Sequence, residues 1–469
     1  MKSLSQLSVL LACGSAAGRA LRSSALLSVA GCSLLVITPL HAGIAENASR
    51  QKVAGIDVVA LKTGVRDVVT IRGDLPAGDS RSPDTNSALA DLAAGMLDKG
   101  TTKNDKFAIS KQLGDVGANV SFGTNSAALN ISAKCLRADL PLVLGLIAEQ
   151  LRTPAFSPEE FAKLKKQLVG NIRRAMEDVD SRSDIAFNNA VFPLGHTNRR
   201  PATAQFLADV DKATLDEVKA FYQQYYGPAA MKLVIVGDVD PDAARGEVGK
   251  AFAGWTGGSP APKAAKAGTV DAARDQNVFM AGKASVSVLW GQATQLRYGD
   301  PDGLALRIGT TALGSGFTGR LMANVRDKEG LTYGIYSAVT NDTYADGDWR
   351  IGAQFAPELL EKGLSSTRRQ LAAWHKNGIT EAELASNKGK YVGSYKLGLA
   401  TTGGMADAIL NTMNRDLPLS FIDEFGPRIN SLTLAQVNGA IEKHLDPAKM
   451  ILIKAGTVPG AMPVPAPRG

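Results

Sequence analysis

The side chains that most often perform hydrolytic chemistry are few and widely separated in this chain. Four histidines occur among the 469 residues, and three follow the N-terminal segment: His196, His375 and His444. None of these has a histidine four residues away, whereas zinc requires three or four nitrogen, sulfur or oxygen ligands. No Gly-x-Ser-x-Gly elbow, paired catalytic carboxylate motif or phosphate-binding glycine loop is present either. We therefore expect that the chain cannot hold a catalytic zinc ion by itself, and that these histidines lie in loops or at the surface.

Cysteine use and charge narrow the class of protein further. Cys13 and Cys32 lie in the N-terminal segment, which leaves Cys135 without a partner for an intrachain disulfide. No Cys–His motif surrounds Cys135, so we expect a small buried residue and not a nucleophile. The formal charge is +7, and removing the three basic residues of the leader leaves +4. With no helix-turn-helix, zinc-finger or aromatic RNA-binding pattern, the sequence does not indicate a nucleic-acid partner.

Residues 1–42 have the pattern of an export signal. Basic residues end at Arg22, an apolar run of about 16 residues follows over 25–40, and Leu40-His41-Ala42 offers a site for a signal peptidase. That run is shorter than the roughly 20 residues that span a bilayer. A lipoprotein signal with Cys32 as the lipidated residue is the alternative, and the apolar residues after Cys32 argue against it. We expect an exported protein, with the Gram-negative periplasm as its destination and no membrane span in the mature chain.

An internal repeat divides the mature chain into two halves. The segment from Ala213, ATLDEVKAFYQQYYGPAAMKLVIVGDV, aligns without a gap to LTLAQVNGAIEKHLDPAKMILIKAGTV from Leu432, at an offset of 219. Each copy has a threonine N-cap, a proline that ends the helix and an apolar strand that ends in glycine. A second match, at an offset of 223, aligns Ser157 with Thr380 at the start of two capped helices. A repeat of about 220 residues is too long for a solenoid and indicates duplicated domains.

Strand-like hairpins alternate with helix-like runs in each half, which predicts an α+β fold. We expect two duplicated α/β-sandwich domains, each an antiparallel sheet flanked by helices. The domains are placed at 50–256 and 275–457. A linker rich in Gly, Pro and Ala joins them over 257–274, and a Pro-rich tail over 458–469 is expected to be disordered.

Over about 400 residues the mature chain resembles the pitrilysin-type (M16, inverted-zincin) metallopeptidases. Active members carry His-x-x-Glu-His on a helix just before a Gly-Thr pair, and a second Glu some 76 residues later completes the zinc site. The Gly-Thr landmark here is Leu97-Asp-Lys-Gly-Thr101. The resemblance then implies that Asp91 and Gly95 replace the two histidine ligands. By the same count Ala94 replaces the general base and Asn171 replaces the third ligand, so all four functional positions differ.

The second half keeps another motif of this family. Arg326-Asp-Lys-Glu-Gly-Leu-Thr-Tyr333 matches the family pattern R-x-K-x-G-L-x-Y, and Gly314-Ser-Gly-Phe-Thr-Gly-Arg-Leu321 before it is also family-like. The resemblance implies that this pair faces the zinc across a closed chamber. Tyr333 would then stabilise the oxyanion of peptide hydrolysis, and Arg326 would hold a substrate carbonyl or carboxylate. The structural alternative is a surface ion pair of Arg326 with a nearby acid and packing of Tyr333 at the start of a strand.

Two functions stay open at this stage. In the first, the chain is the zinc-free subunit of a heterodimeric peptidase: a homologous partner supplies the zinc, and this chain supplies Arg326 and Tyr333 to a shared peptide site. In the second, it is a non-enzymatic scaffold or peptide-binding module of the same fold. Retention of the Arg/Tyr segment favours the first. The basic run 163–166, with Arg173 and Arg174, is expected to form a solvated helix face.

Overall fold

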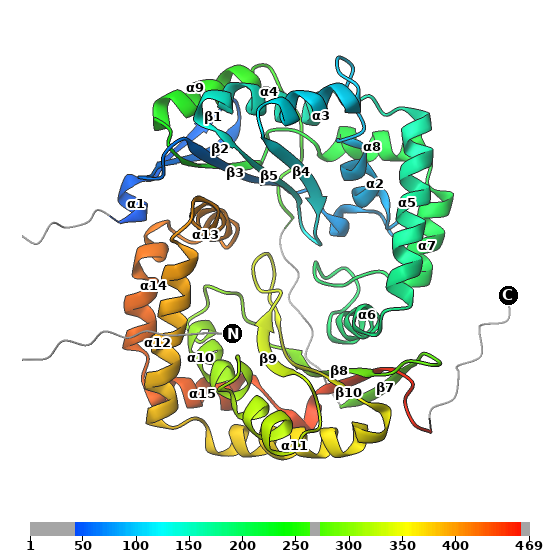
Figure 1. Cartoon of the computed structure of the whole chain (residues 1–469), viewed down its shortest axis with the longest axis vertical. Helices are drawn as coiled ribbons and strands as arrows, with labels where there is room; N and C mark the ends of the chain where they lie inside the picture. The colour runs from blue at the N-terminus through cyan, green and yellow to red at the C-terminus, as the bar shows by residue number, and fades with distance from the viewer. Residues whose placement is uncertain (1–42, 263–272, 461–469) are drawn as a thin grey trace, which may run out of the picture. The chain divides into compact units, whose positions relative to one another are not determined.

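The structure, a computed structural model, describes residues 43–262 and 273–460. The predicted leader, the middle of the predicted linker and most of the predicted tail therefore lie outside the described residues. The described halves form one compact unit built on two mixed β-sheets (Figure 1). None of the described helices is long and apolar enough to cross a bilayer.

The two sheets have six and five strands. The order is β1-β2-β6-β3-β5-β4 in the first sheet and β7-β11-β8-β10-β9 in the second. The first sheet consists of β1 (Ser49–Val53), β2 (Ile56–Lys62), β3 (Val68–Leu75), β4 (Asn119–Thr124), β5 (Leu129–Leu136) and β6 (Lys232–Gly237). The second sheet consists of β7 (Arg274–Phe279), β8 (Val286–Ala293), β9 (Ile335–Thr340), β10 (Asp348–Phe355) and β11 (Ile451–Gly456).

The second sheet repeats the topology of the first. In each half the first strand of the repeat pairs in parallel with the last one, β2 with β6 and β7 with β11. The remaining pairs are antiparallel and follow the same order, β6-β3-β5-β4 and β11-β8-β10-β9. Strands β6 and β11 are separated at both ends by the offset of 219 that the sequence repeat has. The predicted α+β class with two duplicated domains is confirmed, although each sheet is mixed and not purely antiparallel, because it contains one parallel pair. The domain limits at 50–256 and 275–457 stay predictions.

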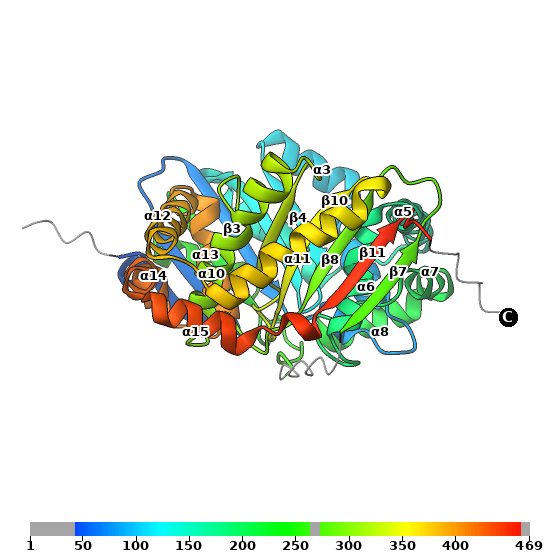
Figure 2. The same cartoon turned by 90° about the horizontal axis from the view of Figure 1, so that it is seen from below.

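Helices flank each sheet. Those of the first half are α2 (Leu89–Met96), α3 (Lys106–Asp115), α4 (Leu140–Arg152), α5 (Pro158–Met176), α7 (Thr203–Lys212), α8 (Leu215–Tyr225) and α9 (Pro241–Ala251). Those of the second half are α10 (Gly303–Gly314), α11 (Leu360–Asn377), α12 (Glu381–Gly398), α14 (Ser420–Ser431) and α15 (Leu434–His444). Figure 1 shows α5 on one side of the molecule and α12 and α14 on the other, between the two sheets. Figure 2 shows α10, α11 and α15 on the outer side of the second sheet, where they share one apolar core with its strands.

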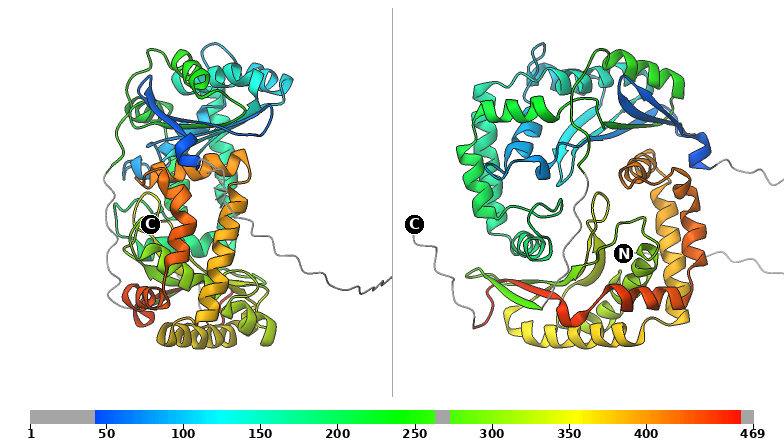
Figure 3. Two further views of the ribbon diagram at one scale, coloured as in Figure 1. Left: turned by 90° about the vertical axis from the view of Figure 1, so that its left-hand side faces the viewer. Right: turned by 180° about the vertical axis from the view of Figure 1, so that it is seen from behind.

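The inner face of each sheet is covered by a helix from the other half. Helix α6 (Val179–Val191) belongs to the first half and packs on β8 and β11 of the second sheet. Helix α13 (Thr402–Asn414) belongs to the second half and packs on β3 and β6 of the first sheet. The two helices begin 223 residues apart, so they are the same element of the repeat. Figures 1 and 3 show each helix beside the sheet of the opposite half.

An ion pair joins each of these exchanged helices to its sheet. Asp184 on α6 binds Arg350 of β10 at 2.7 Å, and Asp407 on α13 binds Arg72 of β3 at 2.8 Å. The two aspartates are also 223 residues apart. Arg350 is buried and bonds Asp348 as well, at 2.6 Å, whereas Asp407 is about half exposed. The first pair therefore joins a buried arginine to a partly exposed aspartate, and both members of the second pair are more exposed.

The two pairs should contribute unequally to stability. Asp184→Asn removes a carboxylate from a buried guanidinium that keeps Asp348, so we expect the free energy of unfolding to fall by about 1–3 kcal/mol. The matched change Asp407→Asn breaks a pair that water screens and should cost less than about 1 kcal/mol. Urea unfolding of both variants measures the difference. Equal losses in the free energy of unfolding would contradict the conclusion that the Asp184 pair is less exposed to water than the Asp407 pair.

Candidate functional site

The four positions predicted to replace the zinc ligands and base lie on two packed helices. Asp91, Ala94 and Gly95 are on α2, with Asp91 and Gly95 one turn apart on the same face, and Asn171 is on the neighbouring helix α5. The arrangement of helices that a zinc site would need is therefore present. Asn171 is exposed and accepts a hydrogen bond from Arg174 of its own helix.

The space beside Gly95 is filled by a side chain of α5. A Cβ atom on Gly95 would lie 2.9 Å from both methyl carbons of Leu164, which is closer than side chains pack. Leu164 is buried, and Ala94 is buried one residue before Gly95. Within 43–262 and 273–460, no three His, Cys, Asp or Glu side chains gather as metal ligands. The residues present at these positions do not fit a zinc ion.

Two carboxyl groups lie near each other where the metal site has been lost. Burial raises the pKa of Asp91, and a hydrogen bond from Thr124 partly opposes that rise. Burial, and then the charge of Asp91, raise the pKa of Asp79 to about 7. Asp79 belongs to the 3-10 turn η1 (Asp79–Arg81), and its Oδ1 is buried without a hydrogen-bond partner. The pair therefore holds a proton near neutral pH, and a neutral carboxyl group is a poor metal ligand.

Asp79→Asn should change how stability depends on pH. The unfolded chain ionises Asp79 at about pH 4, whereas the folded chain does so at about pH 7. The folded state binds this proton more tightly than the unfolded state does. Protonated Asp79 therefore adds its full contribution to the free energy of unfolding below about pH 4, and that contribution is lost as the pH rises through about 7. The Asn variant should lose less stability than the parent between about pH 5 and pH 8 in urea unfolding. The exposed control Asp216→Asn should follow the parent, and parallel curves for all three chains would refute the assignment.

Restoring the family's residues should not restore zinc binding by itself. Asp91→His, Ala94→Glu, Gly95→His and Asn171→Glu together place an imidazole in the volume that Leu164 occupies. We expect the parent and this fourfold variant to contain no stoichiometric zinc after dialysis. Adding Leu164→Ala should allow zinc to bind, as elemental analysis would show. Stoichiometric zinc in the fourfold variant would contradict the steric argument.

The Arg326–Tyr333 segment forms a compact turn at the surface of the second half. Arg326 lies in a π-helical stretch, η3 (Met322–Lys328), and Gly330, two residues after its end, has a positive φ of 64°. The amide of Gly330 donates to the carbonyl of Arg326 at 2.9 Å, and Leu331 donates to Val325 at 3.0 Å. This left-handed glycine lets the chain reverse from the helix toward β9. The reversal brings Tyr333 back beside Arg326.

The guanidinium of Arg326 lies against two exposed aromatic rings. Its central carbon is 5.2 Å from the ring centre of Phe317 and 5.5 Å from that of Tyr333. Phe317 is 71% exposed and Tyr333 is 91% exposed. The contact of Arg326 with Asp327 is long, at 3.6 Å. Cation–π attraction therefore orients the guanidinium while the Tyr333 hydroxyl stays open to solvent.

A cavity of about 640 Å³ adjoins Tyr333. The second half lines it with Phe317, Met322, Tyr333 and Tyr336, and α6 of the first half adds Asp180, Ser183 and Asp184. The sequence motif includes Phe317 and Tyr333, but it does not predict the α6 residues. They line the cavity only because α6 of the first half packs on the second sheet. Asp91, Ala94, Gly95 and Asn171 do not line this cavity, so the chain does not bring its two predicted sites together.

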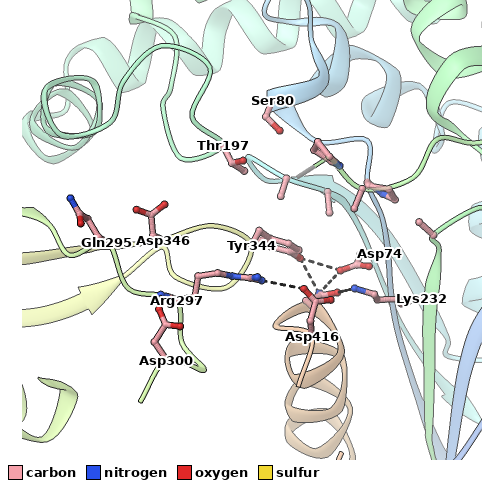
Figure 4. Close-up of a pocket in the computed structure, with 17 residues that line it drawn as sticks. Asp74, Ser80, Thr197, Lys232, Gln295, Arg297, Asp300, Tyr344, Asp346 and Asp416 are labelled. Carbon is pink, nitrogen blue, oxygen red and sulfur yellow. Dashed lines mark hydrogen bonds and ion pairs between the residues drawn. The ribbon is translucent and has the colours of Figure 1, made fainter. Parts of the chain in front are cut away.

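A second cavity, of about 600 Å³, lies between the halves and has a dense polar wall (Figure 4). Asp74 accepts hydrogen bonds from Asn414 and, at 3.1 Å, from Tyr344. Lys232 donates to Asn414 at 2.9 Å. Burial raises the pKa of Asp74, and the charge of Lys232 opposes that rise. These groups satisfy one another across the two halves, so they hold the halves together and leave no free nucleophile or base.

The histidines have structural partners. His196 lies in a loop, which is one of the two placements predicted, and it is buried there: it stacks on Phe192 and bonds Asp346 at 2.9 Å. Its burial comes from the second half, since Asp346 lies in the turn between β9 and β10. His375 bonds the carbonyl of Leu445, and His444 bonds Asp302. No histidine in the described residues is placed for metal binding.

Cys135 and the basic run have the structural roles that the sequence indicates. Cys135 is buried on β5, and burial raises the pKa of its thiol to about 12, so it is not a nucleophile. Lys163 pairs with Glu159 and Glu160 on its own helix, at 2.6 and 2.9 Å. Lys165 donates to two backbone carbonyls near the start of α8. These contacts account for part of the charged face of α5.

Two family profiles match the chain. One is described as insulinase (peptidase family M16) and matches residues 58–197; the other is the peptidase M16 inactive domain and matches residues 212–391. The chain is 27% identical over 323 residues to an uncharacterized zinc protease of Streptomyces coelicolor, which covers 67% of this chain and 69% of that protein. It is 22% identical over 378 residues to a non-peptidase homolog of Helicobacter pylori, covering 79% of this chain and 84% of the other.

Solved structures have the same fold. A peptidase M16 inactive domain from Pseudomonas fluorescens superposes with a TM-score of 0.82 and 25% identity, over 89% of this chain and all of that one. A protease from Helicobacter pylori superposes with a TM-score of 0.79 and 19% identity, over 87% and 99% of the two chains. The periplasmic protease PqqL of Escherichia coli gives a TM-score of 0.71 and 16% identity, and the match covers 88% of this chain and 46% of PqqL.

Proposed function

Because the chain belongs to the peptidase M16 family, we propose that it is the zinc-free subunit of an exported two-subunit peptidase. In this proposal it supplies Arg326 and Tyr333 to a peptide site whose zinc is held by a homologous partner. The observation that carries the proposal is the surface that Arg326, Tyr333 and Phe317 form. The chain retains this surface while its own ligand positions are replaced.

The chemistry assigned to Tyr333 is stabilisation of negative charge. Attack of water on a peptide carbonyl places charge on its oxygen, and a phenol O–H directed at that oxygen lowers the barrier. Zinc in the partner would activate the water and polarise the carbonyl. Tyr333 is 91% exposed, so its hydroxyl is accessible to a substrate that a second subunit presents.

The role assigned to Arg326 is to hold the substrate backbone. A guanidinium presents several N–H donors in a fixed plane and binds a carbonyl or carboxylate with defined geometry. Cation–π contact with Phe317 and Tyr333 restricts its orientation, which lowers the entropy lost when a peptide binds. The adjoining cavity of about 640 Å³ is large enough for one or two side chains of an extended peptide.

A scaffold or peptide-binding role is the second candidate. The non-peptidase homolog of Helicobacter pylori among the relatives favours it, since that name describes a member without peptidase activity. The two candidates differ in whether a partner with His-x-x-Glu-His is present. Isolation of the tagged chain from its native host with an equimolar zinc-binding homologue favours the split peptidase, and a stable homodimer without such a protein favours the scaffold.

Export to the periplasm is part of the proposal. Its support is the leader pattern of residues 1–42, together with the fold shared with a periplasmic protease. Fractionation of cells that express the full sequence tests it, and recovery of the chain from the cytoplasm alone would refute it.

Tyr333→Phe tests the proposed chemistry directly. The chain alone should cleave no peptide, and the reconstituted pair should do so. Removal of the hydroxyl should lower kcat of the pair by on the order of 100-fold, with little change in assembly, because it removes one donor to the oxyanion. Tyr225→Phe is the matched control, since it removes a tyrosine hydroxyl from α8, which does not line this cavity, and it should leave kcat almost unchanged. Equal turnover of the Tyr333→Phe pair and the parent would exclude the proposed role.

A further inference from the structure

The first described residues of the chain make a specific contact with the second half. Helix α1 (Ile44–Asn47) packs on α14 and on β2. The backbone amides of Ile44 and Ala45 donate to the two carboxylate oxygens of Asp423, at 2.9 and 2.8 Å. Ile44 also packs against the apolar cluster that joins α13 to the first sheet. The segment is therefore held by both halves of the fold.

Gly43 approaches the same carboxylate more closely than any other residue type would allow. A Cβ atom on Gly43 would lie 2.4 Å from Oδ2 and 2.6 Å from the carboxyl carbon of Asp423. The amino nitrogen of Gly43 is about 2.5 Å from that Cβ position, so it lies within about 5 Å of the carboxylate. In an uninterrupted chain this nitrogen is a neutral amide. If the bond before it were cut, it would be an ammonium beside a carboxylate.

We propose that the mature protein begins at Gly43 and that its α-ammonium forms an ion pair with Asp423. A leader peptidase of the export pathway would add water across the Ala42–Gly43 peptide bond. The new carboxylate stays on Ala42, and the new amine of Gly43 takes up a proton below about pH 8. Ala42 is a small residue, as such a peptidase requires immediately before the cut. The inference rests on the proposed export of the chain.

In the folded protein the carboxylate of Asp423 lies at the start of the described segment. Asp423 already accepts two amides from the segment, so its carboxylate is directed at the Gly43 end. A chain that began one residue earlier would carry its ammonium about 3.8 Å further along the backbone. A chain that began at Ile44 would place its ammonium 2.9 Å from Oδ1 of Asp423, so the residues Leu40-His41-Ala42 before the cut, and not charge alone, favour the start at Gly43. Cleavage of the leader would thus add an ion pair between the first residue of the mature chain and Asp423 on α14 of the second half.

The position of the N-terminus tests the first part. The full sequence is expressed in a Gram-negative host, and the exported chain is examined by intact mass and N-terminal sequencing. A chain that starts at Gly43 supports the inference. An exported chain that starts elsewhere overturns it while the export proposal stands, and a chain that retains residues 1–42 overturns both.

A four-way comparison tests the ion pair. Folded chains that start at Gly43 or retain Ala42 are prepared with Asp423 or with Asp423→Asn, and an aminopeptidase removes the first residue while intact mass is followed. In the Gly43 form, Asp423→Asn should speed removal about two- to five-fold, because an exposed pair is worth only that much. The effect should vanish above about pH 9, where the ammonium is neutral, and it should be absent when Ala42 is retained. The same effect in both forms, or no effect in either, overturns the ion pair.

Discussion

The exchange of helices α6 and α13 between the two sheets is the constraint on which the rest of the structure depends. The strands are apolar on both faces: on β2, Ile56 and Val58 face the outer core, while Val59 and Leu61 belong to separate apolar surface on the inner side. A sheet of this kind needs two covering layers, since exposed apolar surface costs about 25 cal/mol for each Å². Each half provides only the outer layer for itself and receives the inner layer from the other half. Neither sheet has both of its faces covered by its own half. The ion pair between Asp184 and the buried Arg350 fixes the position of α6 on the second sheet.

The position of the Arg326–Tyr333 surface follows from this exchange. Helix α6 covers β8 and β11, and its acidic side faces the part of the sheet where β9 and β10 lie. The cavity beside Tyr333 is the space between that side of α6, the strands and the turn that carries Phe317. The first half thus shapes the site in the second half, although it donates no residue of the predicted motif. A change that loosened α6 would alter this cavity without touching Arg326 or Tyr333.

Patterns among residues close in sequence predict the repeated elements well, but they do not predict how distant segments pack together. Thr214, Thr380 and Thr433 each form the capping box that the sequence suggests, because a cap depends on residues only three apart. The strand repeat and the left-handed Gly330 are predictable for the same reason. The partner sheet of α6 is not, since an apolar helix face does not specify which of two apolar sheets it meets. The burial of His196 and the filling of the lost metal site by Leu164 were missed because both depend on contacts between distant segments.

The two predicted sites have diverged in opposite physical directions. At the predicted degenerate metal site the side chains satisfy one another: Leu164 packs on Gly95, and Thr124 donates to Asp91. At the other site the described chain leaves Phe317 and Tyr333 open, and Arg326 finds its nearest acid only at 3.6 Å. Exposed aromatic rings gathered around a cation are unusual on a surface that faces only water, and they mark surfaces that meet another molecule. This contrast within one duplicated chain is the physical basis of the proposal that a second molecule completes the Arg326–Tyr333 site.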